Sequence, residues 1–113
     1  MSELHLPPKR QIDPTKLVEY LLHPEKGRGK AQLFYKFGFT LLNWERLNTA
    51  LLEHAETMPI SETIATTYGT KYIVTGGLGT PDGRIPSPLI AAVWIQEEGK
   101  EGVRFVTAYP ARS

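Results

Sequence analysis

The residues best suited to chemistry gather in one loop near the N-terminus. His23 lies a few positions before Arg28, Gly29 and Lys30, in the segment HPEKGRGK. Histidine transfers protons near neutral pH, the arginine fork and the lysine point charge bind phosphate, and glycine lets backbone approach a ligand closely. Because a helix is expected to begin at Lys30, the segment predicts an anion-binding site at a helix start.

An alternative interpretation makes this loop a tight connection between two helices, with the side chains of His23 and Lys30 solvated. A Walker phosphate loop is excluded. That motif needs a preceding strand, wider glycine spacing and a Ser or Thr after the lysine, whereas Ala31 follows here. The loop is therefore expected to contribute to a shared site rather than to bind phosphate alone.

A second candidate lies on an expected strand. Alternation puts Lys71 on the same face as Ile73 and on the face opposite to Tyr72. If Tyr72 points to the helices, Lys71 lies on the open face of the sheet, where its charge could stabilise a scissile phosphate. The alternative is an ordinary exposed strand lysine.

Two hydroxyl groups lie near the C-terminus. Thr107 and Tyr109 are two residues apart at the end of the last expected strand, where they could position and polarise a phosphate. Strict alternation groups them with Phe105 and puts Arg104 on the other face, unless a bulge intervenes. The alternative is that Tyr109 is a core residue whose hydroxyl reaches the rim.

The elements that must position these residues follow from hydrophobic periodicity, which changes from helical to strand-like after residue 60. We predict an α+β fold with three short N-terminal helices packed on one face of a four-stranded antiparallel meander sheet. An extended arm over residues 1–12, with two consecutive prolines, precedes a single domain over residues 13–113. The expected helices are about 14–22, 30–37 and 42–55, and the expected strands are about 62–67, 71–75, 87–96 and 103–109.

Composition limits the chemistry. The chain of 113 residues has no cysteine, which excludes disulfides, zinc–thiolate sites and thiol nucleophiles. No His or carboxylate residues show metal-ligand spacing, so neither a metal nor a cofactor is expected. The net charge is +1 overall but +3 over residues 1–36, which indicates either a local basic patch or helices whose charges merely solvate the fold. Without a long apolar run or a secretion signal, the protein is expected to be soluble and cytoplasmic.

The loop and the strands together resemble a family of small bacterial proteins that is defined as a domain of unknown function. The resemblance covers about residues 8–110 and implies no particular activity. It rests on His23-Pro24, Gly27 to Ala31, Phe34, Gly38-Phe39, Trp44, Tyr68 to Tyr72, Val93 to Ile95 and Val106 to Pro110.

At a more distant level the layout resembles the barnase, EndoU, colicin and RelE group of ribonucleases, in which helices precede a four-stranded antiparallel sheet. Several toxins of this type end in a strand similar to Val106 to Pro110. That resemblance implies cleavage of RNA without a metal, and a cognate antitoxin or immunity protein as partner. This chain departs from the group in having no histidine in the expected sheet, so a mechanism with paired histidines is not expected.

The resulting hypothesis is a small toxin-like ribonuclease that acts on RNA phosphodiesters without a metal. The candidate catalytic residues are His23, Lys30, Lys71 and Tyr109, and the candidate substrate-binding residues are Arg28, Gly29 and Thr107. In this scheme the histidine is the acid or base and the cations stabilise the phosphorane. The rival hypothesis is a non-catalytic interaction module of the immunity or antitoxin type, which would bind a protein through an acidic rim at Glu97, Glu98 and Glu101.

Overall fold

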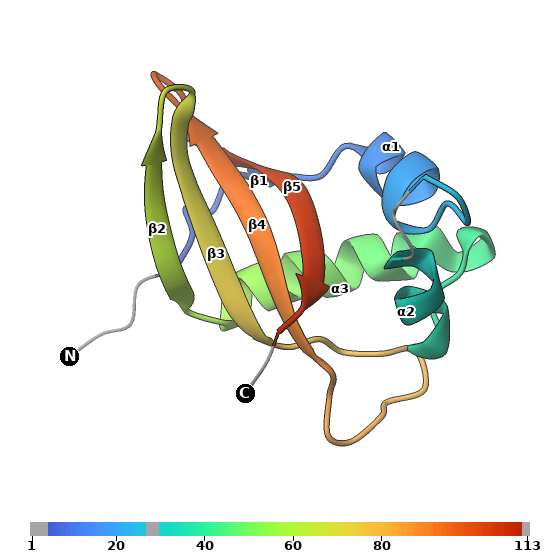
Figure 1. The fold of residues 1–113 in the computed structure, drawn as a ribbon. Coiled ribbons are helices and arrows are strands. Elements are labelled where there is room, and N and C mark those ends of the chain that lie inside the picture. Colours follow the sequence, from blue (N-terminus) through green and yellow to red (C-terminus); the bar gives the residue numbers. More distant parts are fainter. Residues whose placement is uncertain (1–4, 27–29, 112–113) are drawn as a thin grey trace.

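The fold is a five-stranded sheet with helices around one of its edges and across one of its faces (Figure 1). The computed structural model describes residues 5–26 and 30–111. The strands are β1 (Arg10–Gln11), β2 (Ile60–Thr66), β3 (Gly69–Gly77), β4 (Leu89–Glu97) and β5 (Val103–Pro110). The helical elements are α1 (Pro14–Lys16), the π-helical turn η1 (Leu17–Leu21), α2 (Lys30–Lys36), the 3-10 turn η2 (Leu41–Asn43) and α3 (Trp44–Thr57).

The sheet order is β1-β5-β4-β3-β2, and β2 to β5 form the antiparallel meander that the sequence predicts. The prediction of four strands was incomplete, because β1 adds a fifth in parallel with β5. The backbone N–H of Val103 donates to the carbonyl of Lys9 at 2.9 Å. A Cβ at Gly102 would lie 2.7 Å from that same carbonyl, so the close approach of the arm requires glycine.

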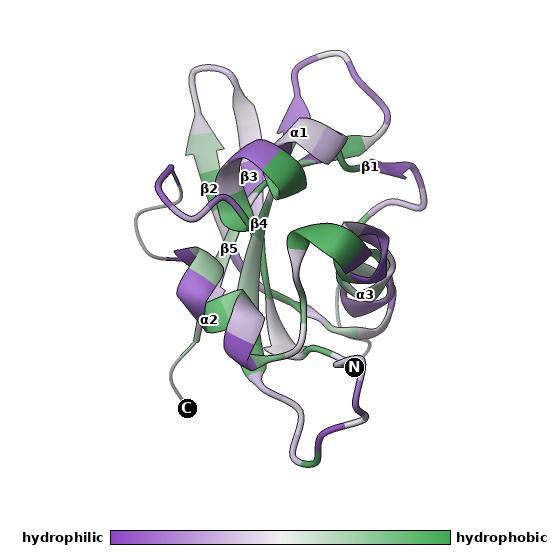
Figure 2. Ribbon diagram, turned by 90° about the vertical axis from the view of Figure 1, so that its right-hand side faces the viewer, coloured by the Kyte–Doolittle hydropathy of each residue, from purple (hydrophilic) through white to green (hydrophobic). Residues whose placement is uncertain are grey.

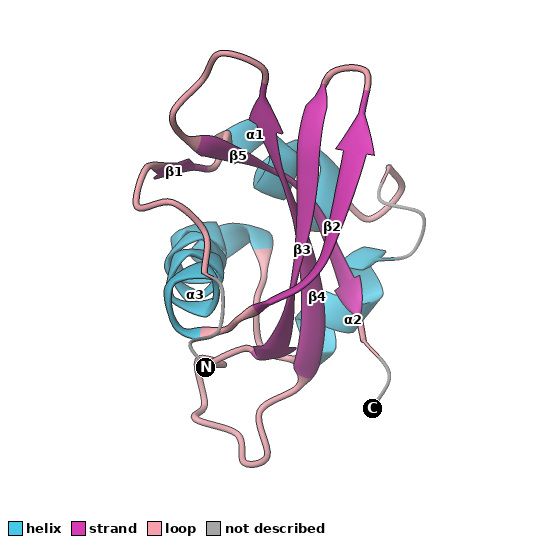
Figure 3. Ribbon diagram, turned by 90° about the vertical axis from the view of Figure 1, so that its left-hand side faces the viewer, coloured by secondary structure: helices cyan, strands magenta, loops and turns pink. Residues whose placement is uncertain are grey.

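The helices share one core with one face of the sheet but also extend past one of its edges, which the prediction did not include. In the opposite views of Figures 2 and 3, α3 lies to one side of the strands and α2 to the other. β1 pairs with only the first two residues of β5. The rest of this edge has no strand neighbour among the described residues, and α1, η1 and α2 lie beside it (Figure 1).

The first helix begins as predicted but changes its geometry. The Asp13 carboxylate accepts a hydrogen bond from the Thr15 N–H at 3.0 Å, which caps the start of α1. One turn later the helix widens, and the N–H of Leu22 donates to the carbonyl of Leu17, five residues back, at 2.8 Å. Both leucines are buried, while Tyr20 packs against the edge of the core beside α2.

The core lies between the sheet and the helices. Trp94 on β4 is fully buried, and its ring meets that of Phe105 edge-on with centroids 5.5 Å apart. The alternate residues of β4 are buried too, since Ala91, Val93 and Ile95 are only 4–8% exposed. The continuous apolar run in this strand is thus explained by its central place in the sheet.

His54 joins α3 to the sheet. Its Nε2 lies 3.1 Å from the carbonyl oxygen of Gly76 and 3.0 Å from that of Ile90, and the side chain is buried. One ring proton thus bridges two adjacent strands. Burial lowers the pKa of this histidine below its ordinary value of 6.5, against the smaller opposing effect of the two carbonyls.

His54 should make the protein less stable in mild acid. Its pKa is lower in the folded state, so the unfolded chain binds the proton more readily below about pH 6.5. The stabilisation is present in full above that pH and is lost as the pH falls from there towards the lowered pKa. Urea denaturation at pH 8 and pH 5.5 should show a larger drop in unfolding free energy for the wild type than for His54→Gln. Equal drops would contradict this role.

Candidate functional site

A bulge in β5 decides which of its side chains reach the candidate site. Trp94 pairs with Phe105, but the preceding residue of β4, Val93, pairs with Thr107, so Val106 is the extra residue. The ring of Phe105 therefore enters the core, while Thr107 takes the opposite face. Strict alternation, which grouped these two residues, does not hold across the bulge.

We call the sheet face that carries Thr107 the outer face. Cross-strand neighbours share a face, so the register defines its residues. Its three rows across β3, β4 and β5 are Lys71, Ile95 and Arg104; then Ile73, Val93 and Thr107; then Thr75, Ala91 and Tyr109. The outer face is thus an apolar floor on β4 with polar and charged side chains on both flanking strands.

Lys30 reaches this face from the first residue of α2. Its ammonium donates a hydrogen bond to Thr107 Oγ1 at 3.0 Å and lies 5.3 Å from the centre of the Tyr20 ring. The structure therefore brings together two candidate residues that are 77 positions apart in the chain. Tyr20 was not identified from the sequence, where it looked like one more apolar residue of a helical stripe.

Two lysine side chains bring positive charge to the outer face. Within residues 5–26 and 30–111, no carboxylate forms an ion pair with Lys30 or with Lys71. The lysine ammonium of α2 is held instead by a hydroxyl and by the face of an aromatic ring. Such a charge is fixed in position yet remains able to attract an anion.

Lys71 and Tyr109 flank the contact between Lys30 and Thr107. Both are half-buried on the outer face, in the rows on either side of the row that contains Thr107. These two rows are four residues apart along β4, which is about 13 Å. The two residues therefore share a face but do not touch, and an extended substrate would be needed to meet both.

His23 forms the turn that precedes α2. Its Nδ1 accepts hydrogen bonds from the backbone N–H groups of Glu25 at 3.1 Å and Lys26 at 3.2 Å. A ring nitrogen that accepts carries no proton, so the proton of the neutral ring is on Nε2. As arranged, the half-buried imidazole is a turn-forming group with one N–H donor for a ligand. The candidate substrate-binding residues Arg28 and Gly29 lie outside the described residues.

The described part of the chain contains neither a metal-ion cluster nor a membrane-spanning helix. No three His, Asp or Glu side chains gather there in a group that could hold a metal ion. None of the helices between residues 5 and 26 or between 30 and 111 is both long and apolar enough to cross a membrane.

The fold is shared with a chain from a solved structure described as a contact-dependent growth inhibition toxin–immunity protein complex from Klebsiella pneumoniae 342. The two chains superpose with a TM-score of 0.70 at 17% sequence identity, over 88% of this chain and 98% of the other. A family model described as a domain of unknown function (DUF6883) matches residues 6–112, so the chain belongs to that family. No curated protein matches the sequence.

Proposed function

We propose that this protein is a toxin-like ribonuclease that cleaves RNA phosphodiesters on the outer face of its sheet without a metal. The observation that carries the proposal is the contact of Lys30 with Thr107. It places a charge that has no ion-pair partner among the described residues beside a hydroxyl that borders the apolar floor of β4. A scissile phosphate bound there would meet a cation and a hydrogen-bond donor at once. The toxin–immunity complex with the same fold supports the toxin class.

The chemistry would be attack of the ribose 2′-oxygen on the adjacent phosphorus. The attack forms a phosphorane, and the bond to the 5′-oxygen then breaks. The 2′-hydroxyl loses its proton to a base, and the leaving 5′-oxygen gains one from an acid. Lys30 and Lys71 stabilise the charge that builds on the phosphoryl oxygens, with Arg28 as a further cation, and Thr107 positions the phosphate.

His23 and Tyr109 are the proposed proton-transfer groups. As arranged, His23 offers only an Nε2–H donor, because Nδ1 accepts from two backbone amides. To act as acid or base through Nε2, its ring must give up those two bonds, so proton transfer is coupled to an opening of the turn before Lys30. The Tyr109 phenol, which lies on the outer face, carries a second transferable proton.

The rival function is an immunity or antitoxin-type module that docks through its acidic rim. The charges of that rim support it less well than the Lys30 contact supports the ribonuclease. Glu97 is paired with Arg104 at 2.9 Å and Glu101 with Lys9 at 3.2 Å, so two of the three rim carboxylates are already partly neutralised. We therefore propose that the chain binds a cognate immunity protein as its partner, and that it is not itself the immunity protein.

Expression in a bacterial cytoplasm separates the two functions. The proposed ribonuclease should arrest growth and degrade cellular RNA, and the purified protein should cleave total RNA in the presence of EDTA. An interaction module would permit normal growth and leave RNA intact. The cytoplasm is the proposed place of action, because that is where the RNA substrate is found.

A further inference from the structure

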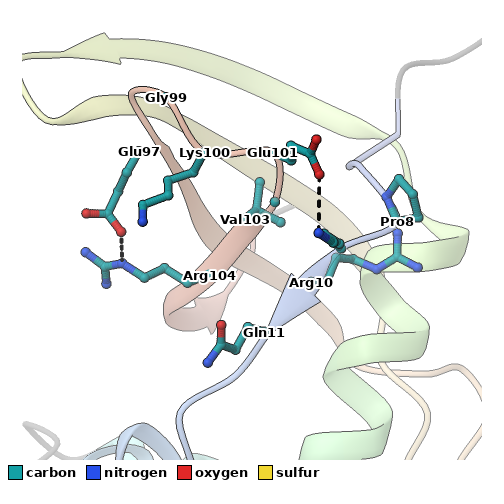
Figure 4. Close-up of a pocket in the computed structure, with 11 residues that line it drawn as sticks. Pro8, Arg10, Gln11, Glu97, Gly99, Lys100, Glu101, Val103 and Arg104 are labelled. Atoms are coloured by element: carbon teal, nitrogen blue, oxygen red, sulfur yellow. Dashed lines mark hydrogen bonds and ion pairs between the residues drawn. The ribbon is translucent and has the colours of Figure 1, made fainter.

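The N-terminal arm and the hairpin that joins β4 to β5 together line a groove of about 710 Å³ (Figure 4). Its walls are the arm from Pro8 to Gln11 on one side, and Glu97 with the segment Gly99 to Arg104 on the other. The groove exists because β1 adds to the sheet edge here. None of the candidate residues of the outer face lines it.

The groove is predominantly cationic. The residues that line it include four cationic and two anionic ones, a net charge of +2, and the Arg10 guanidinium is hydrogen-bonded to the carbonyls of Leu6 and Pro7 in the arm. The charged residues are Lys9, Arg10, Lys100 and Arg104, with Glu97 and Glu101. Figure 4 shows the Lys100 side chain extending beside Arg104 and Glu97, and no acceptor in the described chain is bonded to its ammonium.

The two ion pairs in the groove are easily exchanged. The side chains of Lys9 and Glu101 are 76% and 84% exposed, and those of Arg104 and Glu97 are 49% and 45% exposed. Ion pairs this open to solvent contribute at most about 1 kcal/mol. An incoming phosphate can therefore replace the carboxylate at Lys9 or at Arg104 with little net cost in free energy.

Arg104 connects this groove to the outer face. It lines the groove, and it is also the cross-strand neighbour of Ile95, whose neighbour on β3 is Lys71. Along β5, Thr107 follows three residues later, about 10 Å away. Arg104, which is paired with Glu97, thus lies both in the groove with Lys100 and in the outer-face row that contains Lys71.

We infer that this arm–hairpin groove binds the phosphates of single-stranded RNA beyond the scissile bond and so extends the substrate site. The inference rests on the proposed function. Arginine and lysine side chains at successive points along a groove are what a flexible phosphate backbone requires. The groove would let the enzyme favour long RNA strands over short ones without reading their sequence.

Binding of a 2′-deoxy oligouridylate tests the groove apart from catalysis, because this probe lacks the attacking hydroxyl and cannot be cleaved. Fluorescence anisotropy with the purified full chain would give its affinity over a range of salt concentrations. Lys100→Glu should bind the oligouridylate more weakly. The slope of the logarithm of its binding constant against the logarithm of the salt concentration should fall by about 1. Lys100→Arg should behave like the wild type, and so should Arg46→Glu, an exposed charge reversal on α3.

Three results would overturn the groove assignment. If Lys100→Glu binds the probe like the wild type while the protein cleaves RNA, the groove is not a substrate site and the proposed function stands. If the probe binds through the groove but the wild type cleaves no RNA, the proposed function fails, and with it the assignment of the bound strand as substrate. If Lys100→Glu loses only the binding of an acidic protein partner, the groove is a protein site.

Discussion

Replacement of Lys30 by alanine should lower the rate of RNA cleavage by about 100- to 1,000-fold, the usual effect of removing one preorganised donor from a transition-state site. The ammonium lies 3.0 Å from Thr107 Oγ1 and has no ion-pair partner among the described residues. Negative charge on the phosphoryl oxygens rises as the phosphorane forms, so this interaction strengthens in the transition state. Single-turnover cleavage of a labelled RNA would measure the effect.

Lys36→Ala is the matched control, because it removes an exposed lysine from the last turn of the same helix. It should cleave RNA at the wild-type rate. The lost hydrogen bond of Lys30→Ala should cost about 1 kcal/mol of stability, so both variants should remain folded in a thermal melt. A folded Lys30→Ala protein that cleaves RNA within a few-fold of an active wild type would remove this lysine from the mechanism.

Replacement of His23 by asparagine should lower the cleavage rate by about 100- to 10,000-fold, the range for loss of a general acid or base. The asparagine Oδ1 can accept the backbone N–H groups of Glu25 and Lys26 as Nδ1 does, so the turn is kept while Nε2 is lost. Cleavage rates, measured together with a thermal melt of the same variant, would separate the chemical role of His23 from its structural role.

His23→Gln distinguishes proton transfer from hydrogen bonding. The glutamine amide nitrogen replaces the Nε2–H donor but cannot act as a general acid or base. If the histidine is an acid or base, the glutamine variant should be as slow as the asparagine variant. Recovery of most of the rate by glutamine would show that the ring only donates a hydrogen bond. A fully active His23→Asn protein would reduce the residue to a turn-forming group.

Much of the fold could be predicted because its signals are local. The proline after Asp13, the apolar stripe of α3 and the turn glycines set element boundaries through short-range physics. β1 was missed because a two-residue strand carries no periodicity of its own, and only its docking beside Val103 makes it a strand. The placement of α2 at the β5 edge depends on packing over the whole molecule, which no local pattern reports.

The sequence could predict the face that one candidate residue occupies, but not the geometry of the candidate site. That Lys71 occupies the face opposite to Tyr72 follows from alternation, and the register agrees. The bulge at Val106 could not be located from the sequence, since neither a glycine nor a proline marks it. His23 looked like a free proton carrier because a sequence does not show that the amides of the following turn occupy one of its nitrogens.

The most direct test of the central claim is cleavage of total RNA in EDTA by the purified wild type and by Lys30→Ala, at equal concentrations of folded protein. The outer-face site predicts rapid loss of full-length RNA with the wild type, and a rate about 100- to 1,000-fold lower with the variant. Intact RNA with the wild type, or equal rates for both proteins, would contradict it.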